Sequence, residues 1–222
     1  MAEPFRLPGA DNKTIVIGAN GSGKTIFGAW LLSLQRFDKR PWVILDFKNE
    51  VLWDDVGFPP LRRLRLGEMP GKRGLYVMTV LPGQEEELEK WFWKVLVKEN
   101  IGIFCDEVNM TQYSKGFLAI LRMGRSKHIP IIACTQRPVK VDRELFTECQ
   151  FKVVFRLDDA RDYKTVQEFT GDAPVDVPLP EHWCYWYDSP KRTLHTLKPC
   201  PGPDTIAKSL RRAAPYSWGF GG

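Results

Sequence analysis

Short apolar runs alternate along the chain with stretches in which apolar residues recur at helical spacing. The apolar runs, each typical of a β-strand, span residues 14–18, 42–46, 75–80, 101–106, 129–135, 151–157 and 183–187. The helical stretches span residues 24–37, 84–99, 114–127 and 160–170. Strands that alternate with helices predict an α/β fold, and near-continuous apolar strands predict burial on both faces. We therefore expect a mainly parallel central sheet flanked by helices on both faces.

Length and composition narrow this picture. A chain of 222 residues with 43% hydrophobic residues predicts one α/β domain with a sizeable core and an appended arm. There is no stretch of 18 uncharged apolar residues, and residues 1–12 have no apolar run of the signal-peptide type. The five cysteines form no CxxC pair, and Cys105 and Cys134 lie inside apolar runs. These features predict a cytoplasmic protein without a membrane span.

The net charge of +5 is concentrated near the C-terminus. Residues 189–222 carry six basic side chains and one acidic side chain, so residues 1–188 are neutral overall. We expect residues 1–188 to form the main domain and residues 189–222 a basic, Pro/Gly-containing arm, loose from about residue 199. Two interpretations of the arm stay open: it contacts an anionic molecule or a protein partner, or it is a solvated tail.

A phosphate-binding motif follows the first predicted strand. The segment Gly18-Ala-Asn-Gly-Ser-Gly-Lys-Thr25 fits the pattern GxxxxGK[ST] and lies directly before a predicted helix. Glycines let the backbone wrap closely around phosphate oxygens, and the start of the helix presents its positive end to them. Lys24 is expected to hold the β- and γ-phosphates, and the Thr25 hydroxyl to bind Mg²⁺. The expected nucleotide-binding residues are Gly18, Ala19, Asn20, Gly21, Ser22, Gly23, Lys24 and Thr25.

Two adjacent carboxylates end the apolar run that starts at Ile101. Asp106, at the end of this strand, is expected to complete the Mg²⁺ site. Glu107 is placed to deprotonate a water molecule beyond the γ-phosphate. The alternative is an ordinary pair of capping acids for the next helix, but the P-loop upstream favours the catalytic interpretation. An acid that activates water also favours an ATPase over a kinase, which must exclude water.

Longer stretches resemble the FtsK/HerA superfamily of DNA-pumping ATPases. The resemblance lies in residues 122–138, which end in Thr135-Gln-Arg-Pro138, in Trp42-Val-Ile-Leu-Asp-Phe-Lys-Asn-Glu50 and in residues 151–162. Together with the P-loop, these stretches follow the superfamily's order over residues 13–170. The resemblance implies a P-loop NTPase fold of the RecA/ASCE-like type, with ATP and Mg²⁺ as cofactors.

The resemblance also implies roles for single residues. Gln136 corresponds to a sensor whose amide contacts the γ-phosphate or the attacking water; the alternative is a polar residue at a strand end. Arg125 corresponds to an arginine finger directed at the nucleotide of a neighbouring subunit. Arg122 competes for this role, and either arginine is alternatively surface charge. Asp46 and Lys48 are candidates for the vicinity of the phosphates, but the sequence gives them no role.

A motor domain of this length without added domains is similar to the genome-packaging ATPases of tailless, membrane-containing icosahedral viruses, the tectivirus-like phages and their relatives. The similarity implies an ATP-driven double-stranded DNA translocase that hydrolyses ATP at the subunit interfaces of a homo-oligomeric ring, a hexamer or pentamer. It implies the host cytoplasm or a virion vertex as location, and capsid or vertex proteins as partners of the arm. The alternatives are a host or plasmid HerA-like translocase, a P-loop kinase and a scaffold ordered by nucleotide.

A translocase must move along DNA of any sequence, so its contacts should be mostly to phosphates. Arg62, Arg63 and Arg65 lie in one basic run, which either contacts DNA or is a solvated surface. The candidate DNA-binding residues are Arg62, Arg63, Arg65, Lys115, Arg122 and Lys127. The three histidines have no metal-ligand spacing, so no zinc site is expected.

Overall fold

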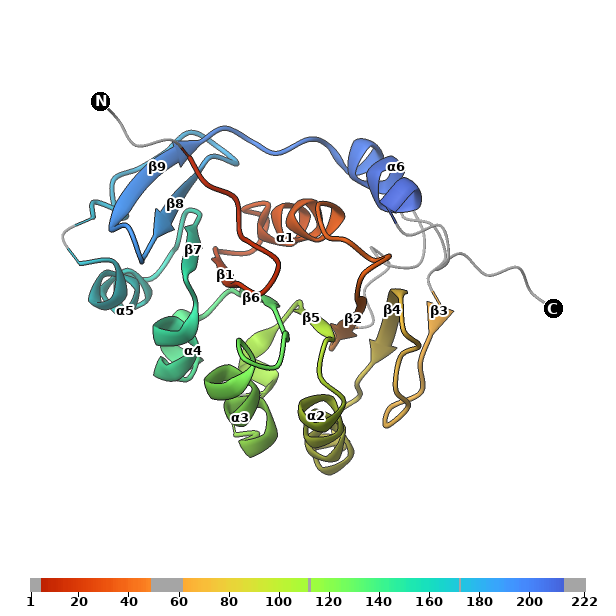
Figure 1. Ribbon diagram of the computed structural model, residues 1–222. Helices are drawn as coiled ribbons and strands as arrows, with labels where there is room; N and C mark the ends of the chain where they lie inside the picture. Colours follow the sequence, from red (N-terminus) through yellow and green to blue (C-terminus); the bar gives the residue numbers. More distant parts are fainter. Residues whose placement is uncertain (1–4, 49–61, 112, 172, 214–222) are drawn as a thin grey trace.

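The computed structural model describes residues 5–48, 62–111, 113–171 and 173–213, and shows one central β-sheet covered by helices (Figure 1). The strands are β1 (Lys13–Ile17), β2 (Pro41–Asp46), β3 (Arg62–Arg63), β4 (Gly74–Thr79), β5 (Gly102–Cys105), β6 (Ile131–Thr135), β7 (Phe151–Val154), β8 (Cys184–Asp188) and β9 (Thr193–Leu197). They lie in the order β3-β4-β2-β5-β6-β1-β7-β8-β9. Neighbouring strands from β3 to β7 in this order are parallel, whereas β8 and β9 are added antiparallel. The expected mainly parallel sheet is confirmed.

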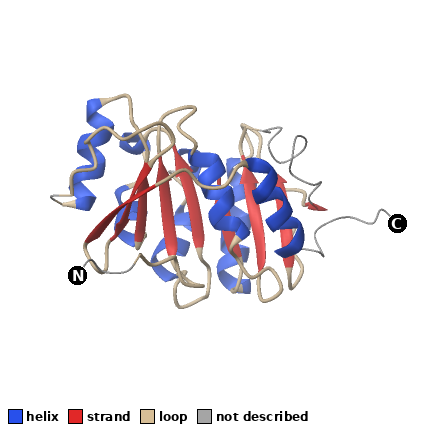
Figure 2. Cartoon of the chain, turned by 90° about the horizontal axis from the view of Figure 1, so that it is seen from above, coloured by secondary structure: helices blue, strands red, loops and turns tan. Residues whose placement is uncertain are grey.

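Helices cover both faces of the sheet, as expected. They are α1 (Lys24–Ser33), α2 (Glu85–Lys98), α3 (Lys115–Met123), α4 (Arg143–Glu148), α5 (Ala160–Thr170) and α6 (Pro203–Ala213). Helices α1 and α6 lie on one face, and α2 to α5 lie on the other (Figure 1). Figure 2 looks down on the face that carries α1 and α6, which lie side by side over the strands.

The burial of the strands explains why they read as continuous apolar runs. Every residue of β1, β2 and β6 is buried, because each of these strands has helices above and below it. On the face of α2 to α5, the core contains Trp91, Phe92 and Phe146. On the other face, Phe27 and the residues around it fill the space between the sheet and α1. Two apolar layers therefore hold the sheet between its helices.

Two helices end earlier than the sequence pattern indicates. Helix α3 stops at Met123 because Gly124 follows: its N–H donates to the Ile120 carbonyl at 2.7 Å, and its own carbonyl accepts from Ile129 N–H at 2.7 Å. A Cβ at Gly124 would lie 2.4 Å from the Ile120 carbonyl oxygen, so only glycine allows this turn. Helix α1 ends at Ser33 and closes with tighter turns over the next residues. Helix α5 has the expected bounds.

The C-terminal segment differs from the loose arm expected after about residue 199. The expected boundary between main domain and arm, at residue 189, lies between the paired strands β8 and β9. Helix α6 packs on α1, with Ile206, Ala207 and Leu210 buried. The prolines near residue 200 suggested irregular structure, but Pro203 occupies the first position of α6, where a helix tolerates proline. Within the described residues, positions 193–213 therefore belong to the same layered body as the rest of the chain.

Candidate nucleotide-binding site

The P-loop leaves the sheet at the end of β1, a strand in the interior of the sheet. We call the side of the sheet where the parallel strands end the carboxyl edge, and the side where they begin the amino edge. Strand β1 lies between β6 and β7, and the P-loop that follows it is hydrogen-bonded to both. Gly18 N–H donates to the Thr135 carbonyl at 3.1 Å, and Ala19 N–H donates to the Arg156 carbonyl at 2.9 Å. The two neighbouring strands thus fix where the loop begins.

Glycines shape the loop itself. Gly23 precedes α1 with φ 96°, a left-handed conformation that glycine adopts without strain, and no side chain caps the helix there. A Cβ at Gly18 would lie 2.4 Å from Ser22 Oγ, so a larger residue at this position would displace the loop. The positive end of α1 is therefore presented to the space inside the loop, where phosphate oxygens would accept its N–H groups.

Lys24 begins α1 and is only 4% exposed. Burial lowers the pKa of its ammonium, and the like charge of Lys48 lowers it further; Cys134, Glu107 and Asp106 act in the opposite direction. An anion in the loop would offset both unfavourable effects by supplying opposite charge in a poorly solvated setting. The free-energy cost of holding the charged Lys24 side chain in this position should therefore be lower with a phosphate bound than without one.

The paired acids lie beside this lysine at the end of β5. Asp106 is 1% exposed and Glu107 8% exposed, and the adjacent strand β6 ends at Thr135 just before Gln136. Glu107 Oε2 accepts hydrogen bonds from Gln136 Nε2 at 3.3 Å and pairs with Lys48 Nζ at 3.1 Å. The two acids directly precede a 3-10 helix, Val108–Thr111, and the next α-helix, α3, is capped by Ser114 instead.

The structure brings most of the expected catalytic residues together at the carboxyl edge, but not Arg125. Arg125 is exposed in the turn between α3 and β6, where its carbonyl accepts from His128 N–H at 3.3 Å. This turn lies at the amino edge, so Arg125 is on the opposite side of the sheet from Lys24 of the same chain. Its competitor Arg122 is exposed and forms a two-point ion pair with Glu144.

The candidate DNA-binding residues do not share one location. Lys115 starts α3 at the carboxyl edge, whereas Lys127 lies at the amino edge and pairs with Glu99. Arg62 and Arg63 form the exposed edge strand β3, and Arg65 follows them. The structure therefore leaves Lys115 and the β3 arginines at separate exposed places, and it shows Arg122 and Lys127 engaged by carboxylates.

Lys48 is the site residue to which the sequence gave no role. It lies just beyond the end of β2, the strand next to β5, and the register that sets Leu45 beside Cys105 carries Lys48 toward Glu107. Residues 49 and 50 of the same expected segment lie outside the described residues. The DxKxE pattern indicated charged residues near the phosphates. It did not indicate that Lys48 would contact Glu107, because that contact depends on the order of the strands in the sheet, which cannot be deduced from spacing along the chain.

A hollow of about 330 Å³ adjoins the P-loop on the side of β7. Its walls include Gly21, Phe155 and Arg156, and the segment from Leu179 to Trp183 closes it. His182 faces the loop, with Nδ1 3.3 Å from the Ser22 carbonyl oxygen. A mixed apolar and polar hollow beside a phosphate loop has the character of a nucleobase site.

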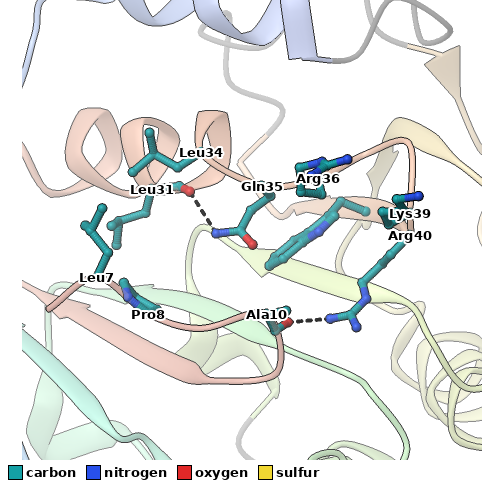
Figure 3. Close-up of a pocket in the computed structure, with 10 residues that line it drawn as sticks. Leu7, Pro8, Ala10, Leu31, Leu34, Gln35, Arg36, Lys39 and Arg40 are labelled. Atoms are coloured by element: carbon teal, nitrogen blue, oxygen red, sulfur yellow. Dashed lines mark hydrogen bonds between the residues drawn. The ribbon is translucent and has the colours of Figure 1, made fainter.

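Another hollow, of about 280 Å³, lies at the amino edge between the end of α1 and the start of β2 (Figure 3). Figure 3 shows Leu7, Leu31 and Leu34 on one side and Arg40 on the other, with Arg40 bonded to the Ala10 carbonyl. None of the expected site residues lines it. The chemistry expected from the sequence is therefore confined to the carboxyl edge, with Arg125 as the exception.

No protein-family model matches the chain. A curated relative does: the chain is 32% identical over 213 residues to the DNA packaging ATPase P9 of Enterobacteria phage PRD1, and the match covers 91% of this chain and 93% of P9. This chain belongs to the P9 family of packaging ATPases. The expected resemblance to the packaging ATPases of tectivirus-like phages is thereby confirmed.

Solved structures support the P-loop ATPase fold of this P9-family chain. The genome packaging NTPase B204 of Sulfolobus turreted icosahedral virus 2, in complex with sulfate, matches with a TM-score of 0.70 at 16% identity over 87% of this chain and 99% of that chain. The pCW3 conjugation coupling protein TcpA, with ATPγS, matches with a TM-score of 0.62 at 14% identity over 89% of this chain and 64% of that one. At these identities the likeness concerns the fold.

The described part of the P9-family chain contains no helix that is both long and apolar enough to cross a membrane. Nor do its described residues include a group of three or more His, Cys, Asp or Glu side chains able to hold a metal ion.

Proposed function

We propose that this P9-family protein hydrolyses ATP with Mg²⁺ and uses the energy to drive double-stranded DNA into a viral capsid. One observation carries the proposal. In a chain related along its length to a DNA packaging ATPase, a buried phosphate lysine, two buried acids and a glutamine are assembled at one edge of the sheet. Binding of phosphate needs the lysine and the N–H groups of the loop, whereas hydrolysis also needs the group that activates water.

The residues present fit a magnesium nucleotide. The Thr25 hydroxyl and the Asp106 carboxylate are oxygen donors, which Mg²⁺ prefers, and the buried Asp106 acts electrostatically on Lys24 of the P-loop. Bound Mg²⁺ would neutralise charge that develops on the phosphates. Lys24 and the N-terminus of α1 hold the phosphate chain, while the hollow beside β7 accommodates the base.

Glu107 acts as the base of the proposed reaction. Its carboxylate takes a proton from a water molecule, whose oxygen forms a bond to the γ-phosphorus as the bond to the β–γ bridging oxygen breaks, giving ADP and phosphate. Gln136, which donates to Glu107 in the structure, is positioned to orient that water and to register loss of the phosphate. Because Glu107 is nearly buried, bulk water does not compensate for its loss.

A ring explains the position of Arg125. An exposed arginine at the amino edge lies on the far side of the sheet from its own P-loop, so its proposed role as a finger requires the nucleotide of another subunit. We propose a hexamer or pentamer in which ATP is bound between subunits. DNA phosphates would contact Lys115 and the β3 arginines, whereas Arg122 and Lys127 must first leave their carboxylate partners.

We propose the host cytoplasm and a virion vertex as the places where this motor works. The family relationship to a packaging ATPase supports this location, because packaging takes place where DNA enters the capsid. Capsid or vertex proteins remain the proposed partners of the C-terminal segment, whose residues 214–222 lie outside the described residues. A P-loop kinase and a nucleotide-ordered scaffold are less well supported, because Glu107, Gln136 and Lys24 are all present and grouped.

The test is hydrolysis of Mg·ATP by the purified chain over a range of protein concentrations, with and without linear double-stranded DNA. Glu107→Gln should lower the rate at saturating ATP by about 10²- to 10⁴-fold while ATP still binds. Arg125→Ala should remove the rise of activity with protein concentration, and Arg36→Ala, which changes another exposed arginine at the amino edge, should not. Hydrolysis that is independent of DNA, of concentration and of Arg125 would refute the ring translocase.

A further inference from the structure

The charged groups at the carboxyl edge form a set whose balance nucleotide would change. Two ammonium groups, of Lys24 and Lys48, lie close enough to repel each other, and two carboxylates, of Asp106 and Glu107, oppose them. Asp46, buried at the end of β2, adds a third carboxylate, so these five groups carry one formal negative charge. A triphosphate brings an excess of negative charge into the set, so at least one existing pair becomes less favourable when it binds.

The ion pair between Lys48 and Glu107 is the pair that nucleotide binding can break. Its atoms lie 3.1 Å apart, and the two side chains are 32% and 10% exposed, so the attraction is only partly screened. The backbone N–H of Lys48 donates to Asp46 Oδ1 at 3.2 Å, which fixes the start of a long, flexible side chain. The ammonium can therefore change partner while its backbone stays in place.

The same pair restrains the base. Lys48 Nζ and Gln136 Nε2 both approach Oε2 of Glu107, the kind of oxygen that must accept a proton from water. Two donors on this oxygen occupy positions from which a water molecule would otherwise donate to it. In this arrangement Glu107 is restrained while Lys48 remains its partner.

We propose that Lys48 is a positioning residue that senses the γ-phosphate: without ATP it holds Glu107 Oε2, and with ATP its ammonium moves to the γ-phosphate and releases Glu107 to act on water. No covalent bond changes in this step; one ion pair is exchanged for another. ADP lacks the γ-phosphate and leaves the pair with Glu107 in place. This inference rests on the proposed ATPase function, and it adds a reason why the base becomes competent only when there is a phosphate to remove.

The exchange predicts a specific dependence between two positions. Lys48 cannot bind both anions equally well, so Glu107 competes with the γ-phosphate for it. Removing the charge of Glu107 should strengthen binding of a triphosphate but not of a diphosphate. Removing the charge of Lys48 should weaken binding of the triphosphate alone, and it should cancel the gain from the change at Glu107.

Equilibrium titration with Mg·ATPγS and with Mg·ADP tests this in wild type, Glu107→Gln, Lys48→Met and the double variant. We expect the ratio of ATPγS to ADP affinity to rise about tenfold in Glu107→Gln and to fall about tenfold in Lys48→Met, the size of one charge-assisted hydrogen bond. The double variant should match Lys48→Met. Lys48→Arg should keep a ratio near that of wild type, and so should Lys39→Met, which removes an exposed lysine at the amino edge.

Equal losses of ATPγS and ADP affinity in Lys48→Met would overturn the inference, because a residue with a purely structural role does not distinguish the two nucleotides. A full gain from Glu107→Gln in the Lys48→Met background would also overturn it, since the two residues would then act independently. If the wild-type chain binds neither nucleotide, the proposed ATPase function itself fails. ADP binding that is unchanged in all variants shows that each variant is folded and that the nucleotide site is intact. A failure of the Lys48 inference can then be distinguished from a failure of the proposed ATPase function.

Discussion

The two edges of the sheet hold their charges in different ways. At the carboxyl edge, Lys24 is nearly buried and its pKa is lowered by burial and by the neighbouring ammonium of Lys48. At the amino edge, Asp11 lies 2.7 Å from Arg40 and 3.0 Å from His128, and the buried ammonium of Lys13 donates to the Leu121 carbonyl. The buried Lys24 ammonium is thus held at a cost that a ligand can relieve, whereas Asp11 and Lys13 have their partners within the protein.

The direction of the strands is one cause of this difference. In a parallel sheet the connections after the strands meet at the carboxyl edge, and the helices that follow begin there with their N–H groups unsatisfied. Anions are favoured at that edge, and because residues 18–25 of the P-loop contain no acidic residue, the loop itself supplies none. The P-loop and the paired acids therefore lie at one edge, where the N–H groups of α1 are available to a ligand.

The largest effect should come from Lys24→Met. Hydrolysis should fall at least about 100-fold, because the phosphates lose their buried positive partner. The pKa of Lys24 is lower in the folded protein than in the unfolded chain, so keeping Lys24 protonated lowers the free energy of unfolding. This loss of stability is present at neutral pH and diminishes only as the pH rises through the lowered pKa. Replacing it by an apolar residue should therefore raise the melting temperature of the nucleotide-free protein by about 2–4 °C, the shift that ~1 kcal/mol produces in a chain of this size.

Differential scanning calorimetry with and without Mg·ATPγS measures both parts of this prediction. Wild type should be stabilised by the nucleotide, and Lys24→Met should not. A nucleotide-free variant that melts below wild type would show that Lys24 already has adequate partners, and the contrast between the edges would be lost.

The opposite sign is expected for Lys13→Met, the matched change at the amino edge. Lys13 is 1% exposed, its ammonium donates to the Leu121 carbonyl, and it lies 3.4 Å from Glu148. The variant leaves a buried carbonyl without its donor, so the free energy of unfolding in urea should fall by about 1–3 kcal/mol. Hydrolysis per folded molecule should stay within about twofold of wild type, since Lys13 is remote from the P-loop. Stabilisation by this substitution would contradict the comparison.

The smallest effect is expected for Asp11→Asn. Burial alone would raise the pKa of Asp11, but hydrogen bonds with His128 and Arg40 outweigh it and lower the pKa below 3.8. A lowered folded-state pKa gives stability that is present at neutral pH and is lost as the pH falls from about 4 through the lowered value. The variant should be less stable than wild type by roughly 0.5 kcal/mol at neutral pH, because the pair is partly exposed.

Urea unfolding at a series of pH values from about 7 to 3 follows this difference directly. The stability curves of wild type and Asp11→Asn should converge toward the acid end. A gap that stays constant with pH would mean that the carboxylate charge of Asp11 contributes nothing to folding.

The sequence predicted those parts of the site that depend on neighbouring residues. The P-loop and the pair Asp106 and Glu107 follow from local spacing beside a strand, and the structure places both at one edge. The pairing of Lys48 with Glu107 was not predictable, because it depends on β2 lying next to β5 in the sheet. The position of Arg125 was equally hidden, since it depends on where α3 ends relative to the sheet.

The same division applies to the fold. Strands that are buried on both faces were predicted from their apolar runs, because most of their positions are apolar. Strand β9 was missed because its residues are only partly buried. Helix α6 was missed because its buried residues, Ile206, Ala207 and Leu210, are few and stand among basic residues and prolines. Amphipathic elements such as β9 and α6 can be recognised only when the surface that they cover is known.

The packing of α6 on α1 also sets an order for biosynthesis. Helix α1 belongs to the first part of the chain to leave the ribosome, yet α6, which covers it, is made near the end. Strand β1 likewise waits for β6 and β7, its two neighbours in the sheet. Until then Phe27 and Leu31 of the nascent chain lack part of the apolar surface that buries them in the folded protein. Helix α1 therefore gains its final apolar cover only after every strand of the sheet has been made.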